Sequence, residues 1–204
     1  MKLTVAVKLI PTQEQASALL RTLELANDAA NYISEWAWYN RTFRQYDMHK
    51  ALYYEVKARY DLSAQVVVRV IAKVADAYKL DSKRMREFRN HGSIAYDSRI
   101  LAWKVPAQEV SIWTTQGRQR IPFVCGERNL AMLKHQQGET DLVLRDGEWF
   151  LYTTVDVEEP PPGEPTGWLG VDLGIVNLAT TSEGTIGQAH HLHRRAEKAE
   201  PGAG

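Results

Sequence analysis

The sequence predicts an α+β fold in which a small antiparallel β-barrel carries an inserted helical bundle. Residues 1–10 alternate between apolar and polar side chains, as a half-buried strand does, and residues 11–92 show the apolar spacing of helices. Residues 93–158 instead hold short apolar runs separated by turn signals. The helical segment lies between two strand-like regions. We therefore expect residues 1–10 and 93–158 to form one barrel, with residues 11–92 inserted in it.

The first strand should end at Pro11, and a helix should begin directly after it. Thr12 followed by Gln15 matches a capping box, in which the threonine oxygen accepts from the third amide of the helix and the glutamine reaches back to the cap. Apolar residues then recur three or four apart, as a single buried helix face requires. They are Ala16, Leu19, Leu20, Leu23, Ala26, Ala30, Ile33 and Ala37.

Two further helices complete the predicted bundle. Asp47 can cap a second, shorter helix that buries Leu52 and Val56, and Ser63 can cap a third. The third helix is expected to carry a line of basic side chains at helical spacing, which we call the basic stripe. Its members are Arg69, Lys73, Lys79, Lys83 and Arg86.

The distribution of charge makes the basic stripe a candidate nucleic-acid contact. Residues 1–125 hold 19 lysines and arginines against 12 acidic residues, whereas residues 126–204 hold 6 against 13, so the net charge of zero conceals a split. A basic excess favours a polyphosphate partner, because each neutralised phosphate releases condensed counterions. A solvated helix face explains the same pattern equally well, and the two interpretations remain open at this point.

The end of the barrel region contains a hairpin, and a linker follows it. Asp146-Gly147 joins two apolar runs, and this dipeptide is favoured where both central residues of a turn need positive φ. Residues 159–166 are rich in proline, which supplies no ladder donors and favours extended backbone. We therefore expect a semi-rigid linker at 159–166 and a new domain beyond it.

One strand after the linker places an acidic residue between two glycines. Gly170, Asp172 and Gly174 share one face of this strand, and the residues between them are apolar and form the other face. The glycines leave room beside the carboxylate for a metal ion or a phosphodiester, at a cost in strand stability. The alternative is an exposed aspartate in a glycine-rich edge strand.

Three segments of the chain resemble the TnpB (OrfB) family of transposon-encoded, RNA-guided DNA nucleases. Residues 167–184 are similar to the first RuvC motif of these proteins and of their type V CRISPR relatives. Val7–Gln15 resembles the opening of the family, and Leu142–Pro162 resembles its strand-turn-strand with a Val-Glu-Glu-Pro-Pro exit. The order and spacing of these segments agree with the family over roughly residues 1–187.

The resemblance implies a role for each part of the chain. Residues 1–10 and 93–158 would form a wedge-type, OB-like barrel, residues 11–92 a helical recognition insertion, and residues 167–187 the start of an RNase H-like (RuvC) nuclease domain. The first two parts would hold guide RNA and target DNA, with the basic stripe on the nucleic-acid backbone. Asp172 matches the first catalytic carboxylate, whose implied role is to coordinate Mg²⁺ that activates water for phosphodiester cleavage.

The sequence also departs from the family pattern. It contains neither the later carboxylates of the nuclease site nor the paired Cys-x-x-Cys zinc ligands, and Cys125 is its single cysteine, so we expect no zinc site. Truncation or a frameshift is the expected explanation, with Mg²⁺-dependent cleavage only in the full-length protein. Residues 188–204 should be a disordered or frameshifted tail, in which His190, His191 and His193 lack the rigid frame of a metal site.

Two other functions fit parts of the sequence. One is a non-catalytic nucleic-acid-binding remnant, in which the barrel and helices bind RNA without a nuclease site. The other is a fragment of an actin-like or Hsp70-like ATPase, which also uses Asp-Leu-Gly, although Ile175 and Val176 stand where those proteins place hydroxyl residues. The sequence has no apolar run of ~18 residues and no signal pattern, so we expect no membrane partner and a cytoplasmic protein.

Overall fold

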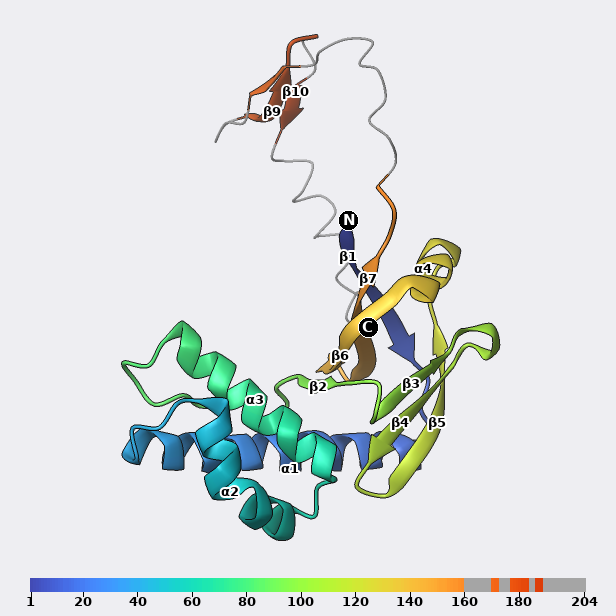
Figure 1. The fold of residues 1–204 in the computed structure, drawn as a ribbon. Coiled ribbons are helices and arrows are strands. Elements are labelled where there is room, and N and C mark those ends of the chain that lie inside the picture. The colour runs from blue at the N-terminus through green and yellow to red at the C-terminus, as the bar shows by residue number, and fades with distance from the viewer. Residues whose placement is uncertain (160–169, 173–176, 184–185, 189–204) are drawn as a thin grey trace, which may run out of the picture. The chain divides into compact units, whose positions relative to one another are not determined.

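The computed structural model describes residues 1–159, 170–172, 177–183 and 186–188. The chain divides into two compact units, Met1–Glu159 and Pro160–Gly204. The division falls at the start of the predicted linker, and residues 160–166 of that linker lie outside the described residues. Figure 1 shows the first unit as a group of helices beside a strongly curved sheet.

The first helix, α1 (Gln13–Tyr39), begins as the sequence predicts. The Gln15 N–H donates to Thr12 Oγ1 at 3.3 Å, and the Thr12 N–H donates to Gln15 Oε1 at 3.0 Å, which confirms the capping box. Gln15 Nε2 also donates to the Arg120 carbonyl at 2.9 Å. Gln15 therefore completes the capping box and also links the start of α1 to the barrel.

Two further helices, α2 (Gln45–Tyr60) and α3 (Ala64–Leu80), pack on α1. Ser63 caps α3, with its side chain accepting from the Val66 N–H at 3.3 Å, as predicted. The prediction for Asp47 is wrong: Arg44 occupies the N-cap of α2 without a side-chain bond. Asp47 lies in the first turn instead, where a carboxylate still interacts favourably with the positive end of the helix dipole.

Seven strands form a nearly closed antiparallel barrel-like sheet in the order β2-β6-β7-β1-β5-β4-β3. The N-terminal strand lies in its middle, where Val5 pairs with Thr153 of β7 and Leu9 with Phe123 of β5. This pairing confirms that residues 1–10 join the later strands and that the helices are inserted after the first strand. The strands are β1 (Lys2–Leu9), β2 (Ile94–Tyr96), β3 (Leu101–Lys104), β4 (Glu109–Thr114), β5 (Gly117–Val124), β6 (Gln136–Arg145) and β7 (Glu148–Asp156).

The connections within the barrel are short. The β6–β7 hairpin has Asp146 at φ 51° and Gly147 at φ 76°, as the predicted turn requires. A 3₁₀ turn, η1 (Val105–Ala107), joins β3 to β4, and a short helix, α4 (Glu127–Met132), followed by a second 3₁₀ turn, η2 (Leu133–His135), joins β5 to β6. Asn129 of α4 donates from Nδ2 to the Ala6 carbonyl at 3.3 Å and so holds α4 against β1.

Helices and barrel share a single hydrophobic core. Leu23 of α1, Ile71 of α3 and Leu151 of β7 are fully buried and belong to the same cluster of packed side chains. The alternation of β7 directs Leu151 and its neighbours at every second position inward, as the strand period requires. The helical insertion is therefore packed onto the barrel. Among the described residues, no helix combines the length and apolarity needed to cross a bilayer.

The second unit contains a small three-stranded antiparallel sheet. Its strands, β8 (Val171–Asp172), β9 (Asn177–Thr181) and β10 (Ile186–Gln188), are arranged in the order β10-β9-β8. The sequence predicted the first two strands but not β10. Gln188, predicted to begin a disordered tail, instead ends this strand. Residues 189–204 of that predicted tail lie outside the described residues.

Candidate nucleic-acid interface and catalytic strand

Asp172 lies on β8, where its backbone pairs with Thr180 of β9. The strand pair is closed at its start by Gly170, whose N–H donates to Ser182 Oγ at 3.0 Å and whose carbonyl accepts from the Ser182 N–H at 2.8 Å. A Cβ atom on Gly170 would meet Ser182 Cβ at 3.5 Å, an ordinary contact. The strand pair therefore has room for a side chain at position 170, and packing within the pair does not require a glycine beside Asp172. Gly174 lies outside the described residues.

The basic stripe does not follow one helix. Helix α3 ends at Leu80, where Asp81 adopts an extended backbone, so Lys83 and Arg86 lie in the segment after it. The prediction that the third helix carries all five residues is wrong in this respect. The helix ends there because Asp81 takes local partners: its carboxylate accepts from the Lys83 N–H at 2.9 Å and from Arg84 Nε at 3.0 Å.

The two N-terminal members of the stripe are engaged in packing α3 against the barrel. Arg69 forms an ion pair with Glu139 of β6 and is half-buried. Lys73 Nζ donates to Asn27 Oδ1 at 2.6 Å and to the Ser93 carbonyl at 2.8 Å. Burial lowers the pKa of Lys73 to about 8, and Asp141 opposes that shift. Arg69 and Lys73 therefore stabilise the packing of α3 against its neighbours in the folded protein.

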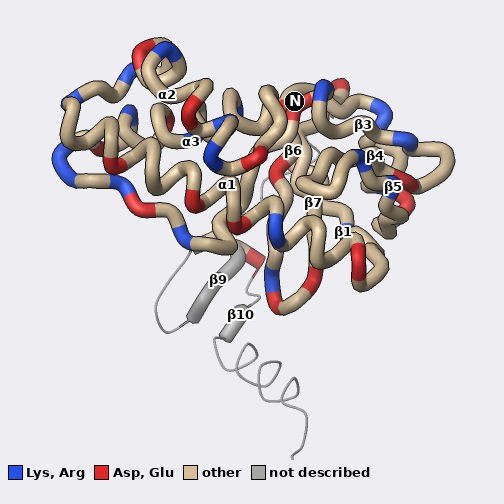
Figure 2. Tube along the Cα trace, turned by 90° about the horizontal axis from the view of Figure 1, so that it is seen from below, with Lys and Arg blue, Asp and Glu red and all other residues tan. Residues whose placement is uncertain are grey.

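The C-terminal members of the stripe lie closer to solvent. Lys79 is exposed and pairs with Asp76 at 2.7 Å, and Arg86 is half-buried and pairs with Asp81 at 3.3 Å. The Lys83 N–H, and after it Arg84 and Arg86, holds the pKa of Asp81 below its ordinary value. Figure 2 shows acidic positions interspersed with the basic ones along this part of the chain. The Lys83 ammonium belongs to none of the ion pairs among the described residues.

The exposed cations in the segment after α3 are therefore more accessible to a phosphate backbone than Arg69 and Lys73. Arg84 and Arg89, which lie beside the basic stripe in the sequence, are exposed in the same short segment as Lys83. A loop of this kind projects its side chains in several directions, whereas a helix would place them in one line. The role of these residues in binding nucleic acid stays a prediction.

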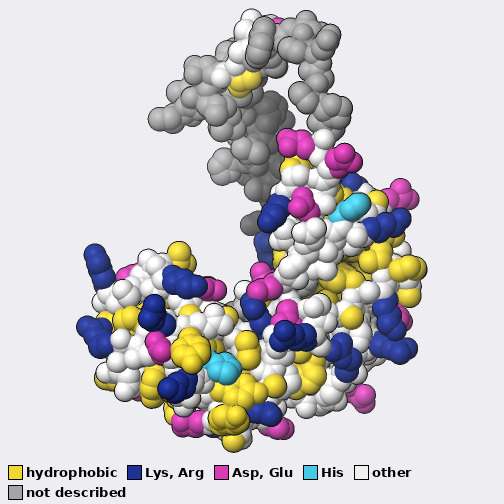
Figure 3. Space-filling model, in the orientation of Figure 1, with side chains coloured by type: hydrophobic (Ala, Val, Ile, Leu, Met, Phe, Trp, Pro, Cys, Tyr) yellow, Lys and Arg dark blue, Asp and Glu magenta, His cyan; other side chains and the backbone are white. Residues whose placement is uncertain are grey.

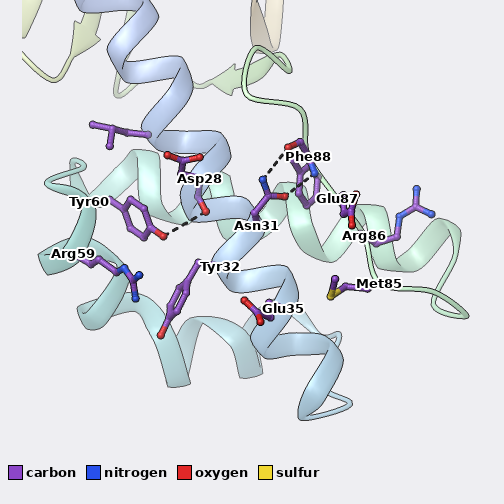
Figure 4. Close-up of a pocket in the computed structure, with 11 residues that line it drawn as sticks. Asp28, Asn31, Tyr32, Glu35, Arg59, Tyr60, Met85, Arg86, Glu87 and Phe88 are labelled. Carbon is purple, nitrogen blue, oxygen red and sulfur yellow. Dashed lines mark hydrogen bonds between the residues drawn. The ribbon is translucent and has the colours of Figure 1, made fainter.

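A cavity of about 790 Å³ lies between α1, α2 and the segment 85–88 (Figure 4). Asn31 fixes its wall by donating from Nδ2 to the Phe88 carbonyl at 2.9 Å and accepting from the Phe88 N–H at 2.7 Å. The Arg59 guanidinium lies 4.5 Å from the centre of the Tyr32 ring. The charged lining residues are three carboxylates and two guanidiniums, so the cavity is poorly suited to a phosphate backbone. They are Asp28, Glu35, Glu87, Arg59 and Arg86.

A second surface, missed in the sequence, lies on α2. Its residues are Tyr46, His49, Lys50, Tyr53, Tyr54 and Lys57, which we call the α2 outer face. Met48, Leu52 and Val56 are buried against the bundle on the other side of the helix. Tyr46, Lys50, Tyr54 and Lys57 are exposed, whereas His49 and Tyr53 are half-buried at the edge of the face, and Tyr53 packs against the core. Helical periodicity could have found this face, because these positions alternate with the buried ones at three- and four-residue spacing.

Among the described residues, no three His, Cys, Asp or Glu side chains lie close enough to share a metal ion. Asp172 supplies the oxygen ligand type that Mg²⁺ prefers, but a single carboxylate does not make a two-metal site.

Comparison with protein-family models finds no match, and comparison with curated proteins finds no significant one.

Proposed function

We propose that this chain is the N-terminal part of an RNA-guided DNA endonuclease of the TnpB kind, which binds guide RNA and target DNA. One observation carries the proposal. A barrel interrupted after its first strand by a helical insertion is followed by a separate unit in which Asp172 lies on an antiparallel strand. That order agrees with the arrangement implied by the three segments that resemble the family.

The proposal assigns nucleic-acid binding to the first unit and a metal ligand to the second. Lys79, Lys83 and the neighbouring exposed arginines supply cations that can neutralise phosphates. Asp172 would hold Mg²⁺, which when bound supplies a nucleophilic water and stabilises the developing charge. Mg²⁺ demands near-octahedral ligation, and two ions ~4 Å apart need several carboxylates, so cleavage is assigned to an assembly that completes the site.

A cleavage assay tests this assignment. The purified chain is incubated with Mg²⁺, its candidate guide RNA and matching DNA, alone and with a downstream nuclease half from a relative. We expect guide-dependent cuts only in the supplemented reaction, and we expect Asp172→Ala to abolish them. Glu183→Ala is the matched control, because Glu183 is an exposed carboxylate in the β9–β10 turn. Guide-dependent cuts by the chain alone that vanish in Asp172→Ala would overturn the requirement for other carboxylates.

A non-catalytic nucleic-acid-binding module is the second candidate. It is favoured by the compactness of Met1–Glu159, which has its own core and its own exposed cations. The two candidates predict the same binding and differ in the supplemented reaction. Cleavage that survives Asp172→Ala, or no cleavage with any nuclease half despite salt-dependent RNA binding, would favour the binding module.

A further inference from the structure

We propose that the α2 outer face is a stacking platform for the unpaired bases of a single-stranded segment of RNA or DNA. The inference rests on the proposed nucleic-acid binding and names the kind of strand and the side chains that would receive it. It differs from the role proposed for the basic stripe, which concerns phosphates and makes no distinction between single strands and duplexes.

The packing of α2 directs this face outward. Met48, Leu52 and Val56 are at most 1% exposed and anchor the helix in the core. Tyr46 and Tyr54, in contrast, are 76% and 82% exposed. Tyrosine is intermediate in its tendency to be buried, but two rings held outward on one side of a firmly packed helix form an exposed apolar surface that a partner can use.

The aromatic rings of the face are arranged next to one another. The His49 and Tyr53 rings are stacked, with centroids 4.8 Å apart and an angle of 25° between their planes. The Tyr53 and Tyr54 rings meet edge to face, with centroids 5.1 Å apart. Eight residues of helix separate Tyr46 from Tyr54, a rise of ~12 Å that corresponds to about three or four stacked bases. Figure 3 shows hydrophobic, basic and acidic side chains intermixed over the helical part, with a histidine among them.

The charge of the face identifies the chemistry of the partner. Lys50 and Lys57 are exposed on it, and the ion pairs among the described residues include neither. Of the two carboxylates of α2, Glu55 accepts a hydrogen bond from Tyr32 of α1, and Asp47 is half-buried in the first turn, so the two exposed lysines leave this helix face with a positive balance. A partner that suits both features has negative charge and flat π surfaces. A single strand offers both, whereas a duplex keeps its base faces inside the stack.

Binding measurements on the full chain test the platform. A labelled oligouridylate and a labelled blunt RNA duplex are titrated by fluorescence anisotropy at fixed salt. We expect Tyr54→Ala to weaken single-strand binding roughly 5- to 150-fold, because stacking on one ring contributes that much, with little change for the duplex. Tyr54→Phe should keep the affinity, since the ring remains. Tyr39→Ala is the matched control, as Tyr39 is 74% exposed but lies at the end of α1.

Photocrosslinking supplies a second readout that does not depend on the variants. Trypsin cleaves after Lys50 and Lys57, so Tyr53 and Tyr54 fall in one peptide, residues 51–57. An oligonucleotide that carries 5-iodouracil should crosslink to this peptide. The proposed platform is contradicted if the double variant Tyr46→Ala/Tyr54→Ala binds single strands as well as the wild type while neutralising Lys83 lowers that affinity. It is also contradicted if crosslinks map only to other peptides. In that case nucleic-acid binding stands and α2 has another partner. Absence of all RNA binding by the wild type would instead contradict the proposed function itself.

Discussion

Lys73 of α3 and Asn27 of α1 are joined by a hydrogen bond of 2.6 Å between Nζ and Oδ1. The Asn27 amide nitrogen in turn donates to the Asn90 and Gly92 carbonyls, at 3.0 and 2.7 Å. The pair thus ties two helices to the loop that returns the chain to the barrel. A lysine that the sequence places in a nucleic-acid contact has a structural role at the junction of bundle and barrel.

The first prediction concerns the energy of this pair. Lys73→Met and Asn27→Ala should each destabilise the fold, and together by less than the sum, because each leaves the other polar group buried without its partner. We expect a coupling energy of about 1–3 kcal/mol from urea unfolding of the four proteins. Lys57→Met, on an exposed lysine, is the control. Additive effects would show that the hydrogen bond contributes nothing to stability.

The second prediction is a pH dependence. Burial lowers the pKa of Lys73 from its ordinary value of 10.5 to about 8 in the folded protein. Between these values the unfolded chain carries a proton on this lysine that the folded chain lacks, so the free energy of unfolding rises with pH in this window. The gain amounts to about 3 kcal/mol; it is complete above pH 10.5 and is lost as the pH falls from 10.5 to 8.

Urea unfolding of the wild type and of Lys73→Met across this window measures the effect. The difference between the two proteins removes the contribution of the other titrating groups. We expect the stability of the wild type relative to the variant to increase from pH 8 to pH 10.5. A difference that stays constant would contradict the lowered pKa.

The third prediction concerns Gly92, which lies against the same pair. A Cβ atom there would meet the Arg89 carbonyl oxygen at 3.0 Å and Asn27 Oδ1 at 3.2 Å. Gly92→Ala should therefore shift the loop and lower the free energy of unfolding by about 1–3 kcal/mol. Gly170→Ala is the matched control, because its Cβ would find only ordinary contacts. Equal thermal stability of both variants and the wild type would show that the loop yields without cost.

The fourth prediction separates structural cations from phosphate-binding ones. Lys83→Gln and Lys79→Gln should each reduce the slope of log affinity against log salt by ~1 and leave stability unchanged, since both side chains are exposed. Arg69→Gln should destabilise the fold, because its partner Glu139 loses its counter-charge. Affinity and slope that are both unchanged after charge reversal of Lys79, Lys83 and Arg86 would identify this segment as a solvated surface.

Several parts of this structure follow from local patterns alone. The Thr12–Gln15 capping box, the Ser63 cap and the Asp146-Gly147 turn depend on residues that are neighbours in the chain, so the sequence predicts them correctly. The end of α3 was missed for a related reason. Basic residues at helical spacing continue past Leu80, but Asp81 offers the Lys83 backbone a competing hydrogen bond that periodicity does not reveal.

The sequence by itself predicted the first strand, the starts of α1 and α3, the division of the chain near residue 159 and the strand that carries Asp172, but not α4, β10 or the end of α3. Only the tertiary structure decided which cations are free. Arg69 and Lys73 look like Lys83 in the sequence, yet their partners Glu139 and Asn27 lie 70 and 46 residues away along the chain. Long-range packing determines desolvation and pairing, and these decide whether a charged side chain holds the fold together or remains available to a partner.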